Sequence, residues 1–182
     1  MNKTSVRGLF ESIVCVVILH PTERKVLTVK MKPSRDLLEE LRSQLSDAEE
    51  RHFPGMGYGA SEGSDVAVHR CVRQKLGAEI DVLERFYLDD RKDIISEEEG
   101  GGTRHVAMWW YLARLRDGSS INIPMSDRND IQPGSEMWST LAEIVQHEEE
   151  CGIKGVAWQR TPVDELWRSL PDTFDRLGYT AS

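Results

Sequence analysis

The apolar positions of the N-terminal third change from a strand pattern to a helix pattern. Residues 13–19 and 25–31 are rich in β-branched side chains and are joined by a turn that contains Pro21. This arrangement predicts an opening antiparallel pair of strands. From Ser34 onward, leucines recur at helical spacing with charged residues between them, which predicts an amphipathic helix over 34–51 with Ser34 as its N-cap.

The next segment combines glycine-rich and helical character. Residues 55–59 read Gly-Met-Gly-Tyr-Gly and predict a loop. Ser64 is a suitable N-cap for a helix that runs to Leu76, and Gly77 is a suitable C-terminal stop.

The C-terminal half mixes strand and helix patterns without regular alternation. Strands are expected at 80–88, 106–115, 121–123 and 156–158. Helices are expected at 136–150, within a helical insertion over 133–150, and after Pro162, which suits a first helical turn. This order favours one α+β domain over residues 1–182 rather than a parallel doubly wound sheet.

Composition and charge remove several classes of function. The 182 residues carry a formal net charge of −8, which argues against a general nucleic-acid binder. The apolar run at 13–19 is too short to cross a bilayer, so no membrane association is expected. Cys15, Cys71 and Cys151 lie far apart and fit no metal-binding spacing, which indicates free thiols in the cytoplasm or another reducing compartment.

One segment resembles a known family motif. Residues 53–64 read Phe-Pro-Gly-Met-Gly-Tyr-Gly-Ala-Ser-Glu-Gly-Ser, and the helix continues through His-Arg-Cys-Val-Arg-Gln-Lys-Leu-Gly at 69–77. Over about 56–78 this resembles the Nudix box, G-x5-E-x7-R-E-U-x-E-E-x-G-U, where U is a bulky aliphatic residue. With Glu62 on the first glutamate, Arg70, Val72 and Gly77 fall on their family positions without a gap.

The box is degenerate at the positions that hold metal in the family. Met56 stands on the first glycine, and Cys71, Gln74 and Lys75 replace the three glutamates that follow the arginine. Their i, i+3, i+4 spacing predicts that the three side chains share one helix face. Since Mg²⁺ requires hard oxygen ligands, a thiol, an amide and an ammonium are expected not to hold Mg²⁺ or Mn²⁺ in the usual way.

The resemblance implies a fold and an activity. The family fold is an α/β/α sandwich around a mixed sheet, and homodimers are common in the family. The implied reaction is attack of water on the phosphoanhydride of a diphosphate-containing small molecule, such as a nucleoside diphosphate derivative. Glu62 and Arg70 are then the candidate catalytic residues, with Glu62 and Glu149 as candidate ligands for Mg²⁺ or Mn²⁺.

Other residues are candidates for direct contact with the ligand. Arg73 and Lys75 could meet phosphate oxygens as fixed cations, and the backbone N–H of Gly57 could approach the same anion; the alternative is that the cations only solubilise an exposed face. Trp109 and Trp110 are adjacent on a strand and must point to opposite faces. One is expected in the core, and the other could stack on a base or cover an apolar ligand.

Two further classes of function remain open. A binding or regulatory module would keep the scaffold without hydrolysis and recognise a nucleotide, an RNA end or a protein partner. An enzyme acting on prenyl diphosphates is the other class, because the helix is also similar to that of isopentenyl diphosphate isomerases. Their catalytic cysteine precedes the box, where this chain has Gly55, and Cys71 is interpreted as a small packing residue rather than a nucleophile.

Overall fold

The central strand β1 (Leu9–Leu19) is buried on both faces, because its side chains alternate between two apolar cores. In the computed structural model, which describes residues 9–32, 51–95, 102–126, 128–153 and 163–179, Val14, Val16 and Ile18 belong to one core cluster. Cys15 and Val17 belong to the other. A continuous run of β-branched residues is what a strand covered on both faces requires.

A mixed sheet surrounds β1. The other strands of the described residues are β2 (Val26–Lys30), β3 (Arg51–His52), β4 (Gly55–Tyr58), β5 (Ile80–Ile95), β6 (Gly102–Leu115) and β7 (Met137–Ser139). The order is β3-β2-β1-β6-β5, with β4 paired to β1 and β7 paired to β2. The β1–β6 pair is parallel and the others are antiparallel.

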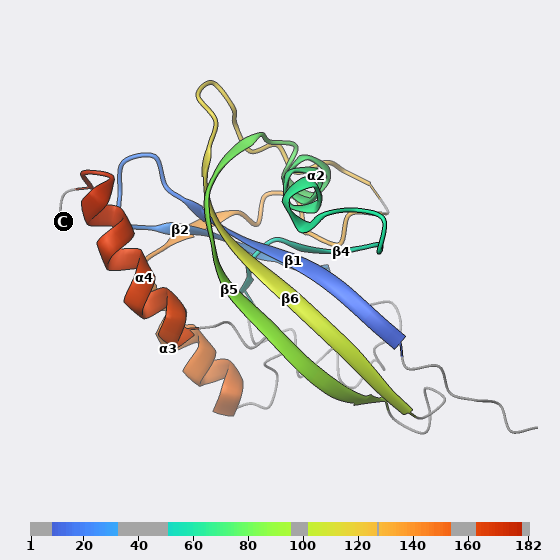
Figure 1. The fold of residues 1–182 in the computed structure, drawn as a ribbon. Coiled ribbons are helices and arrows are strands. Elements are labelled where there is room, and N and C mark those ends of the chain that lie inside the picture. Colours follow the sequence, from blue (N-terminus) through green and yellow to red (C-terminus); the bar gives the residue numbers. More distant parts are fainter. Residues whose placement is uncertain (1–8, 33–50, 96–101, 127, 154–162, 180–182) are drawn as a thin grey trace, which may run out of the picture.

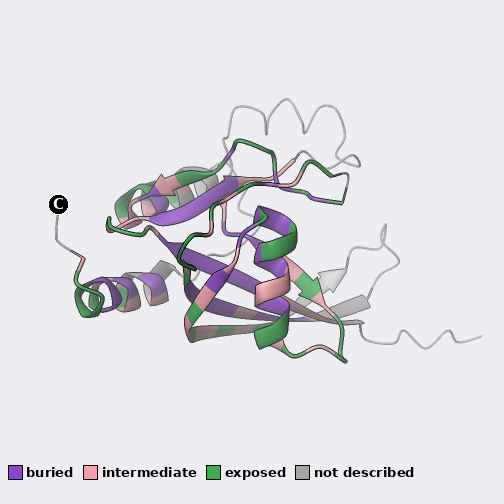
Figure 2. Ribbon diagram, turned by 90° about the horizontal axis from the view of Figure 1, so that it is seen from above, coloured by how far each residue is buried: buried purple, intermediate pink, exposed green. Residues whose placement is uncertain are grey.

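The described helices cover both faces of this sheet (Figure 1). They are α2 (Ser64–Leu76), α3 (Leu141–Ile153) and α4 (Val163–Arg176). Buried residues of α2 join one core cluster, and buried residues of α3 and α4 join the other. Figure 2 shows α2 and α4 with buried residues along one side and exposed residues along the other. The chain is thus a single α/β/α sandwich around a mixed sheet, as expected.

Several expected elements are confirmed. β1 and β2 form the opening antiparallel pair. The helix α2 ends at Leu76, and Gly77 follows it in the left-handed region with a φ of 62°. A Cβ at Gly77 would lie 2.2 Å from the carbonyl oxygen of Asn122, so only glycine fits this close approach. The N-terminus differs from the prediction, because the N-cap is Gly63 and Ser64 is already helical.

Two predicted elements are wrong, and a third has different bounds. Residues 55–58 form β4 rather than a loop, because their backbone pairs with β1. The helix expected at 136–150 begins only at Leu141. The residues before it form β7, whose Met137 pairs with Thr28 of β2. Residues 121–123 form no regular strand. In each case long-range pairing, or its absence, overrides the local pattern.

The start of α3 has a clear local cause. Thr140 Oγ1 accepts a hydrogen bond from the Glu143 N–H at 3.3 Å, and Glu143 Oε2 accepts one from the Thr140 N–H at 2.7 Å. This reciprocal pair is a capping box. The helix therefore starts after Thr140, at Leu141, and not at the first residue of the helical insertion predicted over 133–150.

Other expectations lie outside the described residues. These are the helix at 34–51, except Arg51, which belongs to β3, and the strand at 156–158. The strands expected at 80–88 and 106–115 are longer than predicted, because β5 and β6 pair from Ile80 with Leu115 through to Ile95 with Gly102. No helix in the described ranges is both long and apolar enough to cross a membrane.

Candidate functional site

Glu62, just before α2, forms a two-point ion pair with Arg70 in the middle of that helix. Arg70 Nε donates to Glu62 Oε1 at 2.8 Å, and Arg70 Nη2 donates to Glu62 Oε2 at 2.6 Å. This bond to the guanidinium lowers the pKa of Glu62, so its carboxylate is ionised at neutral pH. The two residues that the motif resemblance singled out are therefore in contact, and the arginine binds both carboxylate oxygens.

Arg70 also ties the segment before α2 to the helix. Its Nη1 contacts the sulfur of Met56 and donates to Gln74 Oε1 at 3.4 Å, while Nη2 reaches the Gly57 carbonyl oxygen at 3.4 Å. A planar guanidinium with five donors is suited to this role. Arg70 thus connects β4, the Glu62 turn and α2.

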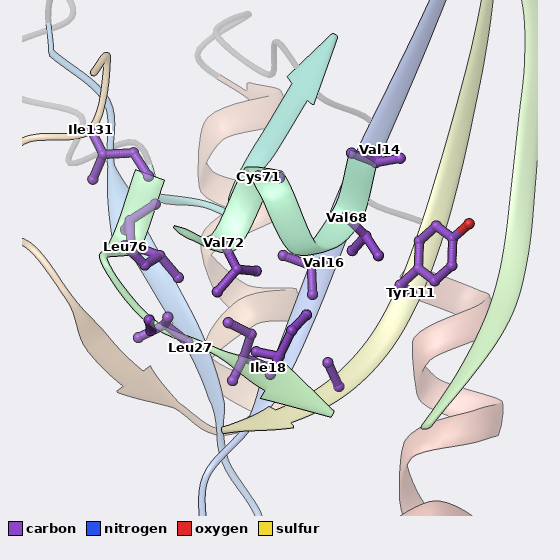
Figure 3. Close-up of a cluster of buried hydrophobic side chains, with 14 of the residues drawn as sticks. Val14, Val16, Ile18, Leu27, Val68, Cys71, Val72, Leu76, Tyr111 and Ile131 are labelled. Carbon is purple, nitrogen blue, oxygen red and sulfur yellow. The ribbon is translucent and has the colours of Figure 1, made fainter. Parts of the chain in front are cut away.

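Cys71 lies in the hydrophobic core. Its side chain is fully buried, and Figure 3 shows it on α2 in the cluster with Val68 and Val72. Burial raises the pKa of the thiol to about 12, although the nearby Lys75 charge acts in the opposite direction. The thiol is protonated at neutral pH, which confirms its interpretation as a packing residue.

Lys75 is held by a carboxylate from a distant segment. Its Nζ forms an ion pair with Asp130 Oδ1, and its side chain is only 9% exposed. The neighbouring Asn129 is also buried, and its Nδ2 donates to the Lys75 carbonyl oxygen at 3.0 Å. Asn129 and Asp130 therefore fasten the C-terminal turn of α2. Sequence reasoning missed both residues.

The three replaced positions do not share one environment. Cys71 and Lys75 are buried, whereas Gln74 is exposed and accepts a hydrogen bond from Arg70. Gln74 lies about 100° around the helix from Lys75, which takes it to the edge of the buried face. The expectation of a single shared face is therefore wrong for Gln74.

The outer face of α2 carries basic residues. His69 and Arg70 are partly exposed, and Arg73 is exposed with its Nε donating to Glu79 Oε1 at 2.8 Å. Positions 66, 69, 70 and 73 follow one helical face. Val66 also lies on this face and is 63% exposed. The outer face of α2 thus carries basic side chains, of which Arg70 and Arg73 are ion-paired with Glu62 and Glu79, while its inner face is mostly apolar.

The tryptophans point to opposite faces, as expected. Trp110 is fully buried in the cluster with α3 and α4. Trp109 packs against the α2 cluster, with the Arg85 guanidinium 4.5 Å from the centre of its ring. Gly57 lies in β4 opposite Ile13. The structure therefore brings Gly57 to Arg70 but places the two tryptophans in separate layers.

The donor set does not fit Mg²⁺ or Mn²⁺ at the inner face of α2. A protonated thiol and an ion-paired ammonium supply no hard anionic oxygen, and Glu62 is engaged by Arg70. Glu149 is exposed on α3, on the other side of the sheet, so the structure does not bring it to Glu62. Within the described ranges, no three His, Cys, Asp or Glu side chains are grouped to hold a metal ion.

Comparison with known proteins defines the fold. No protein-family model and no curated sequence matches this chain. Among solved structures, a NUDIX hydrolase from Nitrosomonas europaea is similar, with 15% identity, a TM-score of 0.53 and coverage of 93% of this chain and 91% of that chain.

Two further solved structures are similar to this chain in fold. The DNA mismatch repair protein MutT of methicillin-resistant Staphylococcus aureus 252, described as a Nudix hydrolase, has 13% identity and a TM-score of 0.53, with coverage of 91% and 99%. The MutT protein of Methanosarcina mazei Go1 has 13% identity and a TM-score of 0.51, with coverage of 97% and 100%. This chain therefore has the fold of the Nudix hydrolases.

Proposed function

We propose that this chain is a binding module with the Nudix fold, which recognises a diphosphate-containing small molecule without metal-dependent hydrolysis. The observation that carries the proposal is the inner face of α2. Cys71 is part of the core there, and Lys75 is ion-paired with Asp130. Two of the three positions that would hold a divalent ion in a hydrolase are thus occupied by a core residue and by an ion-paired lysine.

Glu62 alone is a poor replacement for the missing carboxylates. A divalent ion that activates water needs several oxygen ligands around one open position. The Glu62 carboxylate already accepts two hydrogen bonds from Arg70, and a metal ion would have to displace them. The Glu62–Arg70 pair is better suited to shaping the start of α2.

The outer face of α2 supplies the cations for recognition of phosphate. Arg73 forms an exposed ion pair with Glu79, and ion pairs of this kind contribute little stability. A diphosphate, with more charge than one carboxylate, can compete for Arg73 and for the exposed part of Arg70. Lys75 does not contribute to this face, because it lies on the inner face of α2 and is ion-paired with Asp130.

Phosphoanhydride hydrolysis is the second candidate function. The feature that favours it is Glu62, which keeps the family position relative to Arg70 and lies within hydrogen-bonding distance of it. Hydrolysis would require metal ligands from elsewhere in the chain. An RNA end and a prenyl diphosphate are the alternative ligands.

Titration with defined ligands tests the proposal. The full chain is mixed with ADP, UDP-glucose, a capped RNA and a prenyl diphosphate, with Mg²⁺, with Mn²⁺ and with EDTA, while binding and release of product are followed. We expect binding of a nucleoside diphosphate compound that EDTA does not reduce, without turnover. Turnover that is abolished by EDTA and by Glu62→Gln would overturn the proposal in favour of hydrolysis.

A matched pair of charge reversals locates the binding face. Arg73→Glu removes one charge-assisted contact and is expected to weaken binding about tenfold. Arg168→Glu makes the same change in charge on α4, on the other side of the sheet, and should leave affinity unchanged. Equal effects of the two variants would exclude α2 as the phosphate-binding face.

A further inference from the structure

The turn between β1 and β2 is the place where the end of α4 joins the sheet. Tyr179 Oη donates a hydrogen bond to the His20 carbonyl oxygen at 2.6 Å, and Arg24 forms an ion pair with Asp175. Arg24 Nη2 also donates to the Tyr179 carbonyl oxygen at 3.4 Å, and its guanidinium lies 6.0 Å from the centre of the Phe174 ring. Figure 1 shows the C-terminal end of α4 beside this turn. The turn therefore fastens the end of α4.

The His20 ring holds this turn in shape. Its Nδ1 accepts hydrogen bonds from the backbone N–H of Thr22 at 3.2 Å and from that of Glu23 at 3.0 Å. A protonated ring nitrogen cannot accept, so Nδ1 carries no proton here and the neutral ring carries its proton on Nε2. The observed shape of the turn thus requires a neutral imidazole.

The same turn also offers partners for a charged ring. His20 Nε2 lies 4.0 Å from the Glu23 carboxylate, and the Trp138 ring meets the imidazole edge to face, with the ring centres 4.8 Å apart. Both contacts favour an imidazolium over a neutral ring. The hydrogen bond from Lys25 lowers the pKa of Glu23, so this carboxylate keeps its charge in mild acid. The neutral ring therefore binds the backbone of the turn, whereas a charged ring is attracted to the Glu23 side chain.

The other groups around His20 do not change charge in the same pH range. In the described chain, the titratable side chains that meet the ring or its carbonyl group are Glu23, Arg24 and Lys25 of the turn and Asp175 and Tyr179 at the end of α4. Of the side-chain types present, histidine is the one that changes charge between about pH 5 and pH 8. Burial raises the pKa of Tyr179, so its hydroxyl stays a donor throughout this range.

We propose that His20 is a pH-dependent latch for the C-terminal end of α4. The neutral ring holds the turn in the shape that directs Arg24 and the His20 carbonyl oxygen toward α4. Protonation of Nδ1 removes both of its hydrogen bonds and draws Glu23 toward the imidazolium, and Arg24 then leaves Asp175. The latch is closed at neutral pH and opens as the pH falls. It is independent of the ligand proposed for the outer face of α2.

The two hydrogen bonds to Nδ1 determine the size of the effect. One hydrogen bond of ordinary net strength shifts an equilibrium about fivefold, so the loss of two shifts it by up to about 30-fold. The Glu23 side chain is half exposed, and the ion pair that it gains recovers only part of this loss. We therefore expect protonation to shift the balance between closed and open latch about tenfold toward the open form.

Amide hydrogen exchange at the end of α4 measures this opening. The Gly178 N–H donates to the Asp175 carbonyl oxygen at 3.0 Å, and the Tyr179 N–H donates to the Phe174 carbonyl oxygen at 2.9 Å. The full chain is compared with His20→Asn, whose amide oxygen can accept the same two hydrogen bonds but cannot be protonated. The two proteins should exchange alike at about pH 7.5. At about pH 5 these amides should exchange about tenfold faster in the unmodified chain, and comparison at one pH cancels the intrinsic pH dependence of exchange.

Two more variants separate the latch from general effects of acid. His20→Ala removes the acceptor and should leave the latch open at both pH values, with exchange about tenfold faster than in the unmodified chain at about pH 7.5. His105→Asn is the matched control, because His105 lies at the other end of the β1–β6 pair. It should keep the pH response of the unmodified chain. An equal pH response in the unmodified chain and in His20→Asn would assign the response to another group, such as Asp175, and would overturn the proposal.

Nitrogen-15 spectra of the His20 ring test the latch without any variant. The proposal requires the proton on Nε2 at neutral pH and a Tyr179 amide shift that follows protonation of the His20 ring with the same midpoint. A proton on Nδ1 at neutral pH, or a Tyr179 amide that does not respond when His20 is protonated, would overturn it. If the His20 variants do not fold, these two measurements on the unmodified chain decide the question.

Discussion

The ion pair between Lys75 and Asp130 should stabilise the domain through its charge. Lys75 is 9% exposed on the inner face of α2, and its partner lies 55 residues further along the chain. Asp130→Asn keeps the size of the side chain and removes only the negative charge. The Lys75 ammonium then remains nearly buried without its carboxylate.

The magnitude follows from the exposure of the two partners. Removal of one partner from a fully buried pair costs about 3–5 kcal/mol. The Asp130 side chain is 49% exposed, so water and salt screen part of this interaction. We therefore expect Asp130→Asn to lower the free energy of unfolding by about 2 kcal/mol, which corresponds to about 4–8 °C in Tm for a chain of this length.

A double-mutant cycle measures this interaction. Lys75→Met replaces the ammonium with an apolar side chain of similar length and should change stability by less than about 1 kcal/mol, and Lys75→Met/Asp130→Asn should be close to that single variant. The free energies come from urea unfolding followed by circular dichroism. Additive effects, or an Asp130→Asn cost below about 0.5 kcal/mol, would refute the reasoning.

Three further predictions concern the ends and the core of the helices. Gly77→Ala should lower the free energy of unfolding in urea by more than about 2 kcal/mol, because it adds a steric clash to a strained positive φ. Gly118 also has a positive φ but lies in open space, so Gly118→Ala should lower it by only about 1 kcal/mol. Equal losses of stability in the two variants would contradict the clash. Thr140→Ala should cost about 1 kcal/mol at neutral pH. Hydrogen bonds from the Thr140 N–H and hydroxyl lower the Glu143 pKa from its ordinary 4.5. The stabilisation by these bonds is therefore present above pH 4.5 and is lost as the pH falls through the lower pKa of the folded chain. A Thr140→Ala loss of stability that stays constant down to pH 2 would contradict this reasoning. Cys71 should resist iodoacetamide at pH 8 in the native chain and react after unfolding, as followed by peptide mass spectrometry; rapid native labelling would contradict its burial.

Local sequence signals predicted α2 and the core strand well. The bounds of α2 follow from Gly77, which the left-handed turn requires, and from apolar residues spaced along one face. The seven-residue apolar run at 13–19 predicted a strand, and the structure buries this strand, β1, between the two core clusters. The pattern of the box singled out Glu62 and Arg70, and the structure joins these two residues by two hydrogen bonds.

Long-range contacts could not be predicted in the same way. Residues 55–58 have the composition of a loop, and they form a strand only because β1 is available to pair with them. The start of α3 could have been found, since Thr140 and Glu143 have the spacing of a capping box. Asp130 lies in a polar segment with no local signal, and only the folded chain brings it to Lys75.

Mn²⁺ titration followed by NMR tests the central claim most directly, namely that the inner face of α2 does not hold a divalent ion. Paramagnetic Mn²⁺ broadens the amide signals of residues close to it. The account predicts no saturable broadening centred on Cys71, Gln74 and Lys75, in the unmodified chain or in Glu62→Gln. Saturable broadening at these three residues that Glu62→Gln removes would contradict it.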